Sequence, residues 1–398
     1  MTPGLALFYG GMVRAKNVLA VIMQNFLCMA LVTVLWAVVA CSLAFGSDAG
    51  GGLIGGFGLA GLGGMAHGLP GFQGLTVPPL AVVAFQLMFA IITAALISGG
   101  TVDRMRFPAF ALFIALWVLL VYAPVAHWVF SPEGWMAKHG VLDFAGGTVV
   151  EIDSGFSTLA VVLVIGRRRG WPGEQMAPHS VPLSLLGAGI LWFGWFGFNA
   201  GSALGANAVA AHAFVNTQLA ASAGLIGWIL FERFTEGFPT TLGAASGAVA
   251  GMVAITPCAG YLSAMPSLLV GAVAGVVCAL AVRLKFRWRY DDSLDVLGVH
   301  GVGGLIGMVL LGLFASRAVN PHGANGAFMG GGGHLLGWEC LAAVVAASYC
   351  FAATWVVAKV VDAVVGLRVG PEEEFTGLDL TQHAESAYSM GGTGRIGG

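Results

Sequence analysis

Charged side chains are scarce in this chain of 398 residues, where they make up 9%, against about 25% in an ordinary soluble domain. Hydrophobic residues make up 58% of the chain. This composition excludes a soluble globular protein and predicts an integral membrane protein. The formal net charge of -2 also excludes nucleic-acid binding as the main role.

Cofactor and nucleotide motifs are absent as well. The six cysteines lie in or at the edge of apolar segments without disulfide or metal-ligand spacing, so we expect them to act as small buried hydrophobes. The Gly-rich stretches lack the strand and lysine of a phosphate-binding loop. We therefore expect no enzyme activity, no metal and no other cofactor. Glycine itself is abundant, at 62 residues, and small residues let helices pack closely in lipid.

Long hydrophobic runs fill most of the chain. A window of about 19 residues predicts spans near 18–45, 77–99, 107–129, 146–166, 180–200, 205–231, 240–258, 263–282, 293–315 and 335–366. The apolar start, Met1 to Gly11, is too short to cross a bilayer and resembles the second half of a span. Either the start codon lies upstream or the first helix is a stub. The sequence thus predicts an all-α polytopic membrane protein of about eleven helices with a truncated first helix.

Basic residues alternate between the loops. The loop from Gly46 to Pro78 has none, and on its side of the membrane we expect only Lys138 and Arg317. By the positive-inside rule this side is external, which places the N-terminus outside and the C-terminus in the cytoplasm. We expect a transmembrane domain over 1–366 and a cytoplasmic tail over 367–398. The tail is acidic around 372–374, and disorder is one interpretation of it.

Two ionisable residues, Glu151 and His300, lie inside apolar segments. Each follows an aspartate in a Gly-rich stretch, Asp143 to Glu151 and Asp295 to Gly304, and the two stretches open spans five apart. An odd number of spans per unit predicts an inverted repeat, with a site at the repeat interface. A charge at bilayer depth costs about 2.5–3.5 kcal/mol even on mild scales, so we expect both residues to face a cavity.

The chemistry of this pair has two possible forms in the sequence. Two neutral groups would share a hydrogen bond and accept a proton from a weak acid, whereas an ionised Glu151 would pair with a protonated His300. The alternative to a functional pair is that each side chain satisfies a backbone group at a helix interface.

Aromatic residues form the next pattern. Phe85 and Phe89 share one helix face, and a run from Trp192 to Phe198 crowds the end of the sixth predicted span. Such rings either anchor the protein at the membrane interface or form a vestibule whose ring faces attract a small cation by about 0.5–2 kcal/mol. Asn199 and Ser202 follow at once and offer polar groups.

At these residues the chain resembles the ammonium transporter (Amt/Mep/Rh) family, most closely its bacterial Amt branch. The resemblance implies a homotrimer of eleven-helix protomers, each with its own pore, a 5+5 inverted repeat and a further C-terminal helix. The substrate would be ammonium or ammonia, with methylammonium as an analogue. The matching elements are Gly4 to Arg14, Asp143 to Val150, Trp195 to Ser202, Asp295 to Gly304, Gly377 to Leu380 and Ala384 to Tyr388.

The resemblance also assigns roles. Phe89 and Phe198 would form a stacked gate, His300 would be one member of a proton-handling pair, and Asp143 would order the external site. Glu151 stands where most bacterial members have the other pore histidine, and Phe130 where they have a vestibule tryptophan. Trp128 and Trp135 lie near Phe130 as substitutes. The remaining carried-over residues are Phe85, Phe198 and Ser202 around the vestibule, and Trp195, Asn199, Thr256 and Asp295 as supporting residues.

By this resemblance, ammonium is recruited at the vestibule, loses its proton and crosses the cytoplasmic membrane as ammonia through a hydrophobic pore. A PII-type regulatory protein would bind the cytoplasmic face. Two other readings are an ammonium sensor and an Rh-type gas channel. The Amt-like C-terminal motif argues against the second.

Overall fold

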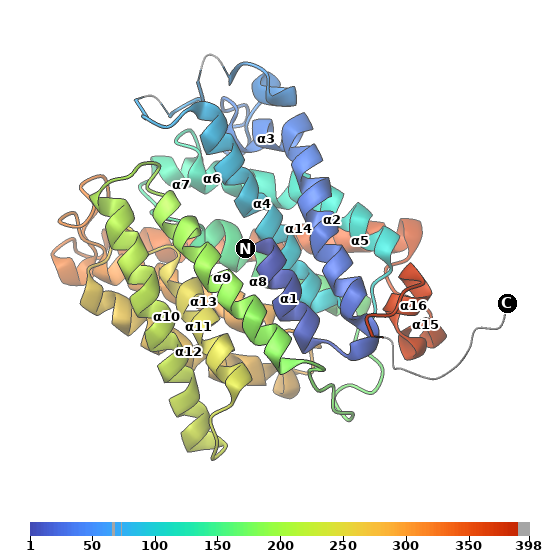
Figure 1. Cartoon of the computed structure of the whole chain (residues 1–398). Coiled ribbons are helices and arrows are strands. Elements are labelled where there is room, and N and C mark those ends of the chain that lie inside the picture. Colours follow the sequence, from blue (N-terminus) through green and yellow to red (C-terminus); the bar gives the residue numbers. More distant parts are fainter. Residues whose placement is uncertain (66–67, 73, 389–398) are drawn as a thin grey trace.

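The fold is made of helices. The computed structural model describes residues 1–65, 68–72 and 74–388, and within them it contains two isolated backbone bridges and no β-strand (Figure 1). Nine helical segments in the described residues are long and apolar enough to cross a membrane: Ala15–Phe45, Pro79–Thr101, Phe107–Lys138, Gly147–Ile165, Val181–Gly201, Ala208–Thr235, Ala264–Trp288, Leu297–Phe314 and His334–Val365. With the shorter α1 (Thr2–Met12) and α11 (Thr241–Ile255), they confirm the predicted eleven.

Several spans are interrupted by π turns, in which the backbone hydrogen bond spans five residues instead of four. The π turns are Trp36–Ala40, Val118–Tyr122, Gly147–Ile152 and Leu297–Gly301. The α-helices are α2 (Val18–Leu35), α3 (Cys41–Phe45), α4 (Pro79–Thr101), α5 (Phe107–Trp117), α6 (Ala123–Phe130), α7 (Trp135–Lys138), α8 (Asp153–Ile165), α9 (Val181–Gly201), α10 (Ala208–Thr235), α12 (Ala264–Trp288), α13 (Val302–Phe314), α14 (His334–Val365), α15 (Pro371–Thr376) and α16 (Leu378–His383).

Local sequence explains where these helices begin. A proline lies in the first turn of α4, α5 and α9, where its missing N–H costs nothing. The side chains of Ser180, Asn207 and Thr240 accept backbone N–H groups at the starts of α9, α10 and α11.

Small residues hold α10, α11 and α12 together. A Cβ added to Gly251 would lie 2.1 Å from the carbonyl oxygen of Ala220, and one added to Gly275 would lie 2.2 Å from that of Gly224. Backbones therefore touch where the sequence has glycine, as expected for helices that associate in lipid.

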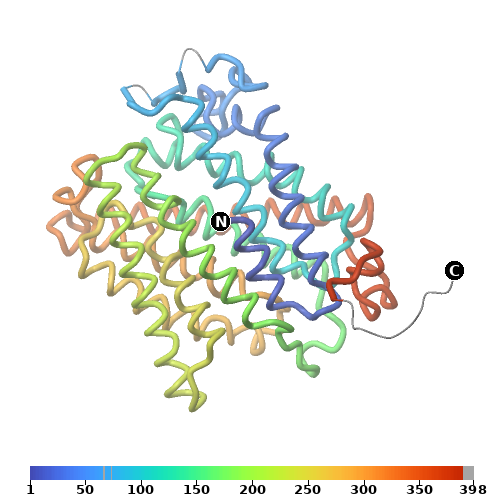
Figure 2. The backbone as a smooth tube through the Cα atoms, in the orientation of Figure 1, coloured from blue at the N-terminus to red at the C-terminus, as the bar shows by residue number. Residues whose placement is uncertain are grey.

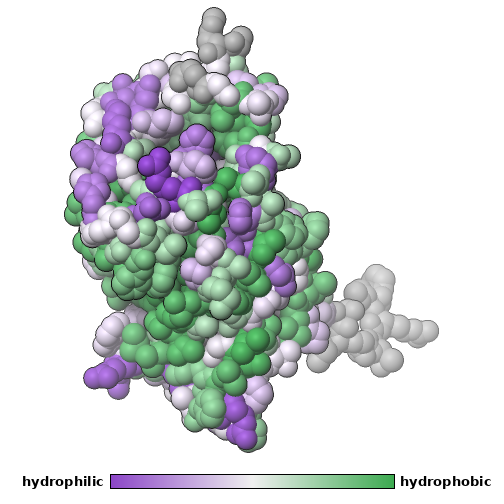
Figure 3. Space-filling view, turned by 90° about the vertical axis from the view of Figure 1, so that its left-hand side faces the viewer, coloured by the Kyte–Doolittle hydropathy of each residue, from purple (hydrophilic) through white to green (hydrophobic). Residues whose placement is uncertain are grey.

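The surface matches a membrane environment. Large hydrophobic side chains such as Phe193 (80% exposed) and Val344 (61% exposed) face outward. On the face shown in Figure 3, hydrophobic residues form a broad area between hydrophilic residues near the top and the bottom. Apolar exposure on this scale is stable in lipid and not in water.

The two ionisable elements correspond residue by residue. Glu151 and His300 are 149 residues apart, and the same separation relates Asp143 to Asp292 and Gly146 to Asp295. Asp143 and Asp292 each accept the backbone N–H of the fifth residue on. Gly146 and Asp295 both have positive φ, of 106° and 63°. The partner of Asp143 is therefore Asp292, whereas the sequence pattern suggested Asp295.

The described part of the tail packs against the start of α2 (Figure 2). Asp379 accepts the N–H groups of Leu19 and Ala20 at 3.0 and 2.8 Å, and Asn17 accepts the N–H of Leu378 at 2.8 Å. Residues 367–388 are thus ordered by specific contacts, and residues 389–398 of the expected tail lie outside the described residues.

Candidate functional site

Glu151 and His300 meet in the middle of the molecule. Each lies on a π turn, and a hydrogen bond of 2.7 Å joins His300 Nδ1 to Glu151 Oε2. Glu151 is 1% exposed and His300 is 4% exposed. The second carboxylate oxygen of Glu151 is buried without a partner among the described residues. An unpaired oxygen beside a bonded imidazole is suited to receive a proton.

Two glycines allow this approach. A Cβ on Gly155 would lie 2.3 Å from Gly301 Cα, and a Cβ on Gly304 would lie 2.9 Å from both Glu151 Cβ and the carbonyl oxygen of Gly147. The two glycines are related by the same separation of 149 residues as the acid and the histidine. Each half of the repeat therefore supplies one ionisable group and one glycine that makes room for the other half.

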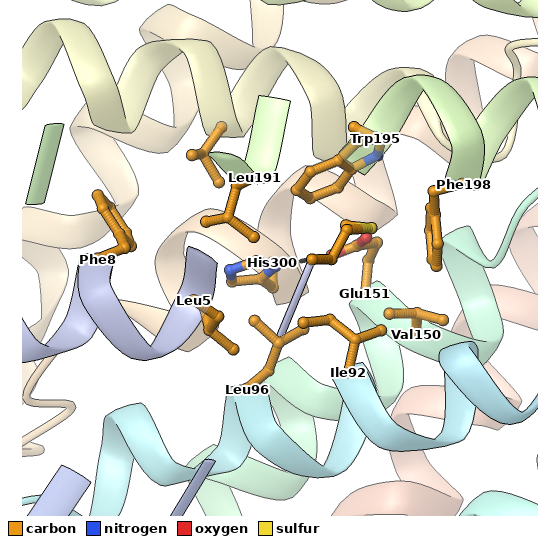
Figure 4. A pocket seen from close by; sticks show the side chains of 12 residues that line it. Leu5, Phe8, Ile92, Leu96, Val150, Glu151, Leu191, Trp195, Phe198 and His300 are labelled. Atoms are coloured by element: carbon orange, nitrogen blue, oxygen red, sulfur yellow. Dashed lines mark hydrogen bonds and ion pairs between the residues drawn. The ribbon is translucent and has the colours of Figure 1, made fainter. Parts of the chain in front are cut away.

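A mostly apolar cavity surrounds the pair. The space in it that the centre of a water-sized molecule can reach is about 10 Å³, so the cavity is narrow. In Figure 4, Phe198 lies at one end of the cavity and Phe8 at the other, with Glu151 and His300 between them. Its lining residues are Met1, Leu5, Phe8, Ile92, Leu96, Val150, Glu151, Leu191, Trp195, Phe198, Val249 and His300.

Stacked aromatic rings separate this cavity from the outer side. The rings of Phe89 and Phe198 are 4.1 Å apart between centroids, with 20° between their planes. Phe85 and Phe130 meet Phe89 edge-on, at 4.9 and 5.7 Å. Hydrated ions cannot pass between rings in contact, so the rings must part before anything moves through.

A wider cavity, in which the centre of a water-sized molecule can reach about 280 Å³, lies on the other side of the rings from Glu151. Of the residues predicted for a vestibule, Phe85, Phe130, Asp143 and Ser202 line it, and Phe198 lines the cavity on the other side of the gate. Its other lining residues are Phe72, Gln86, Val129, Phe144, Ala203, Leu204, Asn207, Val209, Tyr261, Asn320 and His322.

Trp128, also predicted for the vestibule, lies elsewhere. Its indole N–H donates to the carbonyl oxygen of Leu53 at 2.8 Å, and its ring packs 4.7 Å from that of Tyr349 and 6.1 Å from that of Trp135. The side chain is 6% exposed. The indole is therefore used to fasten the external loop, and the aromatic wall of the vestibule is made by phenylalanines.

Asp143 is bound by backbone groups. Its carboxylate accepts the N–H groups of Gly146, Gly147 and Thr148, each at 2.7 Å. Burial raises the pKa of Asp143 above its usual range, and these hydrogen bonds limit the rise. The carboxylate thus shapes the turn that leads to Glu151.

The remaining predicted residues hold the gate and its helix. Trp195 donates to Thr256 Oγ1 at 2.9 Å, and Ser202 donates to the carbonyl oxygen of Phe198 at 2.9 Å. Asn199 donates to Thr217 Oγ1 at 2.9 Å, and its own Oδ1 is buried without a partner among the described residues.

A third cavity lies on the inner side of His300. Asp295, predicted to support the tenth helix, lines this cavity, and the helix-supporting contact to Leu297 N–H is made by Asp292. Sequence reasoning missed most of the lining, since single apolar residues carry no distinguishing signal. The lining residues are Phe8, Tyr9, Met12, Trp228, Ser246, Val249, Leu294, Asp295, Val299 and His300.

The chain is similar to several known proteins over most of its length. An ammonium transporter from Mycobacterium tuberculosis is 49% identical over 423 residues, which cover 98% of this chain and 87% of the relative. The crystal structure of Saccharomyces cerevisiae Mep2 superposes with a TM-score of 0.87 at 34% identity, covering 93% of this chain and 84% of that one. A structure described as a sensor Amt protein has the same TM-score at 28% identity, covering 96% of this chain and 94% of that one.

The family match spans nearly the whole chain. The model of the Ammonium Transporter Family matches residues 1–388, which include the gate, the acid and histidine pair and the described tail. With a relative at 49% identity over almost the full length, this chain belongs to the ammonium transporter family.

Proposed function

We propose that this chain transports ammonium across a membrane by removing its proton and conducting ammonia. The observation that carries the proposal is the Glu151 and His300 pair, joined at 2.7 Å and sealed behind stacked rings in a mostly apolar cavity. Ammonium is a weak acid, and a buried carboxylate beside an imidazole is a suitable acceptor for its proton. The sequence of steps is recruitment in the vestibule, loss of the proton and passage of neutral ammonia.

Selectivity follows from the same arrangement. A desolvated cation in an apolar passage costs many kcal/mol, whereas a neutral molecule enters at little cost. Phe85 and Phe130 present ring faces and edges to the vestibule, and cation attraction there concentrates ammonium before the gate. Potassium is attracted in the same way but has no proton to release, so it stops at the rings.

Current recording on proteoliposomes tests the proposal. An ammonium gradient should drive a net current, methylammonium should drive a smaller one, and potassium should drive none. Uptake without current would indicate transfer of ammonia alone. Neither current nor uptake would favour the second candidate, an ammonium sensor, for which the similarity to the sensor Amt structure is the specific observation. The family is one of transporters, and we propose no chemical conversion beyond proton transfer.

We also propose how the protein is placed and assembled. Two arginine-rich segments, the loop 167–169 and the end of α12 at 283–289, contact each other, and the first also contacts the tail. This shared basic face favours a cytoplasmic C-terminus and an external N-terminus. The expected location is the cytoplasmic membrane. A homotrimer, and a PII-type regulator on the cytoplasmic face, are the partners that fit the family. Size measurement in detergent and co-purification with a PII-type protein test these two statements.

A further inference from the structure

The cavity on the inner side of His300 is lined by an acid, Asp295, that has no counterpart in the other half of the repeat. In the outer half of the repeat the equivalent position is Gly146, while here it is Asp295. Asp292 already accepts the N–H of Leu297 at 2.7 Å, as Asp143 does for its own turn. Asp295 is therefore an addition to the inner half alone.

The backbone at Asp295 is held in an unusual conformation. Its φ of 63° lies in the left-handed region, which non-glycine residues seldom adopt. Glycine, as at the equivalent position 146, would adopt it without strain. Aspartate is among the few other residue types that adopt it, so the backbone permits an acid here and the role of the side chain must be argued from its contacts.

A cation holds that side chain in the cavity. Lys285 Nζ of α12 donates to Asp295 Oδ1 at 2.5 Å and to the carbonyl oxygen of Asp292 at 3.2 Å. Lys285 also lines the next cavity toward the cytoplasmic side, together with Arg14, Arg168 and Glu174. The Lys285 and Asp295 pair thus lies between the cavity of His300 and an open polar cavity.

His300 connects the two sides of the pore. Its ring lines both the Glu151 cavity and the inner cavity that contains Asp295. The bond to Glu151 uses Nδ1, which leaves Nε2 as the second proton-carrying atom of the ring. Besides Lys285 and His300, the ionisable groups around Asp295 are Asp292, Tyr290 and Tyr9.

We propose that Asp295 is the inner proton acceptor, which receives the proton that ammonium leaves on the Glu151 and His300 pair and releases it at the inner mouth. This inference rests on the proposed transport function. In the step, the N–H bond of the imidazolium breaks and an O–H bond forms on the Asp295 carboxylate, directly or through water in the cavity. The carboxyl then gives the proton to ammonia or water arriving at the mouth, and Lys285 keeps its charge throughout.

Asp295→Asn tests the step in proteoliposomes of the full chain. Asparagine keeps the size of the side chain and tolerates positive φ, but it cannot carry the proton. We expect the ammonium current to fall at least about tenfold. Remaining uptake should then bring in ammonia alone and raise the luminal pH reported by an enclosed dye. A purely structural defect would lower current and uptake together.

Two further variants complete the experiment. The double variant Lys285→Gln, Asp295→Asn leaves no unpaired lysine, so it can be measured if the single variant folds poorly. We expect it to lose as much ammonium current as Asp295→Asn. Glu236→Gln is the matched control, because Glu236 pairs with Arg283 on the same helix α12 but is exposed. It should behave as the wild type.

The outcomes separate this inference from the transport proposal. A current in Asp295→Asn equal to that of the control overturns the inner acceptor and leaves transport intact. Uptake by the wild type without current shows that no proton crosses, which also overturns it. Absence of both current and uptake in the wild type rejects the transport proposal and this inference with it.

Discussion

At the scale of single residues, the proposed proton transfer makes its strongest prediction at Glu151. Glu151→Gln keeps the shape of the side chain and a hydrogen bond to His300 but removes the basic oxygen. We expect uptake of methylammonium to fall about 100-fold or more, in the range usual for loss of a general base. Glu151→Ala should in addition weaken the discrimination against potassium, because it opens space in the cavity.

Val150→Ala is the matched control for Glu151, since Val150 lines the same cavity without an ionisable group. It should retain most of the uptake. Wild-type uptake and selectivity in Glu151→Gln would show that the acid is structural. Radiolabelled uptake and potassium-driven current are the two measurements.

Asp143 is the second residue with a distinct expectation. Asp143→Asn keeps one acceptor oxygen but loses the negative charge and one of the acceptors used by Gly146, Gly147 and Thr148. We expect a large loss of transport with a modest loss of folded protein, measured by uptake and by size-exclusion profile. A bound cation directly ligated by the carboxylate would contradict the indirect role.

At the scale of elements, the sequence predicted the spans well and the register of the repeat poorly. Hydropathy locates helices because lipid requires about 20 apolar residues per span. The correct register of the repeat pairs Asp143 with Asp292. Asp292 lies in the polar loop Tyr290 to Ser293, where the sequence does not distinguish it from an ordinary loop acid. Only its bond to Leu297 N–H distinguishes it. Asp295 lies inside the recognised motif, so the sequence pattern paired it with Asp143 instead.

The prediction that Trp128 lines the vestibule differs from the structure for a similar physical reason. A tryptophan near a vestibule motif predicts an aromatic wall, but the sequence does not indicate which way an indole turns. The carbonyl oxygen of Leu53, far away in the sequence, accepts its N–H and draws it into the external loop. Residues whose partners are local, such as Asp143 and Ser202, could be predicted from the sequence.

Helix packing gives a prediction at this scale. Gly251→Ala places a methyl group 2.1 Å from the carbonyl oxygen of Ala220 and must separate α11 from α10. We expect the free energy of unfolding to drop by about 1–3 kcal/mol, the usual cost of overpacking, measured as a lower midpoint of thermal aggregation in detergent. Gly189→Ala is the control, because a Cβ there meets nothing within 4 Å. Equal midpoints for the two variants would show that α10 and α11 are not tightly packed.

At the scale of the whole molecule, the tail connects segments that are distant in the sequence. Glu374 accepts from Arg368 at 2.7 Å and from the backbone N–H of Arg169 at 2.7 Å, while Asp379 binds the start of α2. We predict that deletion of Arg368 to Gly398 lowers transport and abolishes binding of a PII-type regulator. Uptake and co-purification measure the two effects.

Asp379→Ala is the sharper form of that experiment, since it removes only the contacts to α2. The loss of a helix cap should cost about 0.5–2 kcal/mol and loosen the tail, with a smaller loss of transport than the deletion. Full transport together with intact regulator binding in the deletion would return the tail to the interpretation of a dispensable end.

The docking of the tail also has a consequence for biosynthesis. The carboxylate oxygens of Asp379 accept the N–H groups of Leu19 and Ala20, which lie 360 and 359 positions earlier in the chain. The first N–H groups of α2 therefore stay without these acceptors while the ribosome makes nearly the whole protein, and they are satisfied only when the last segment emerges. A chain stalled before Leu378 would carry every membrane span and still display an open helix end at the cytoplasmic surface. We therefore expect an unfinished chain to differ from a finished one in the exposure of these N–H groups.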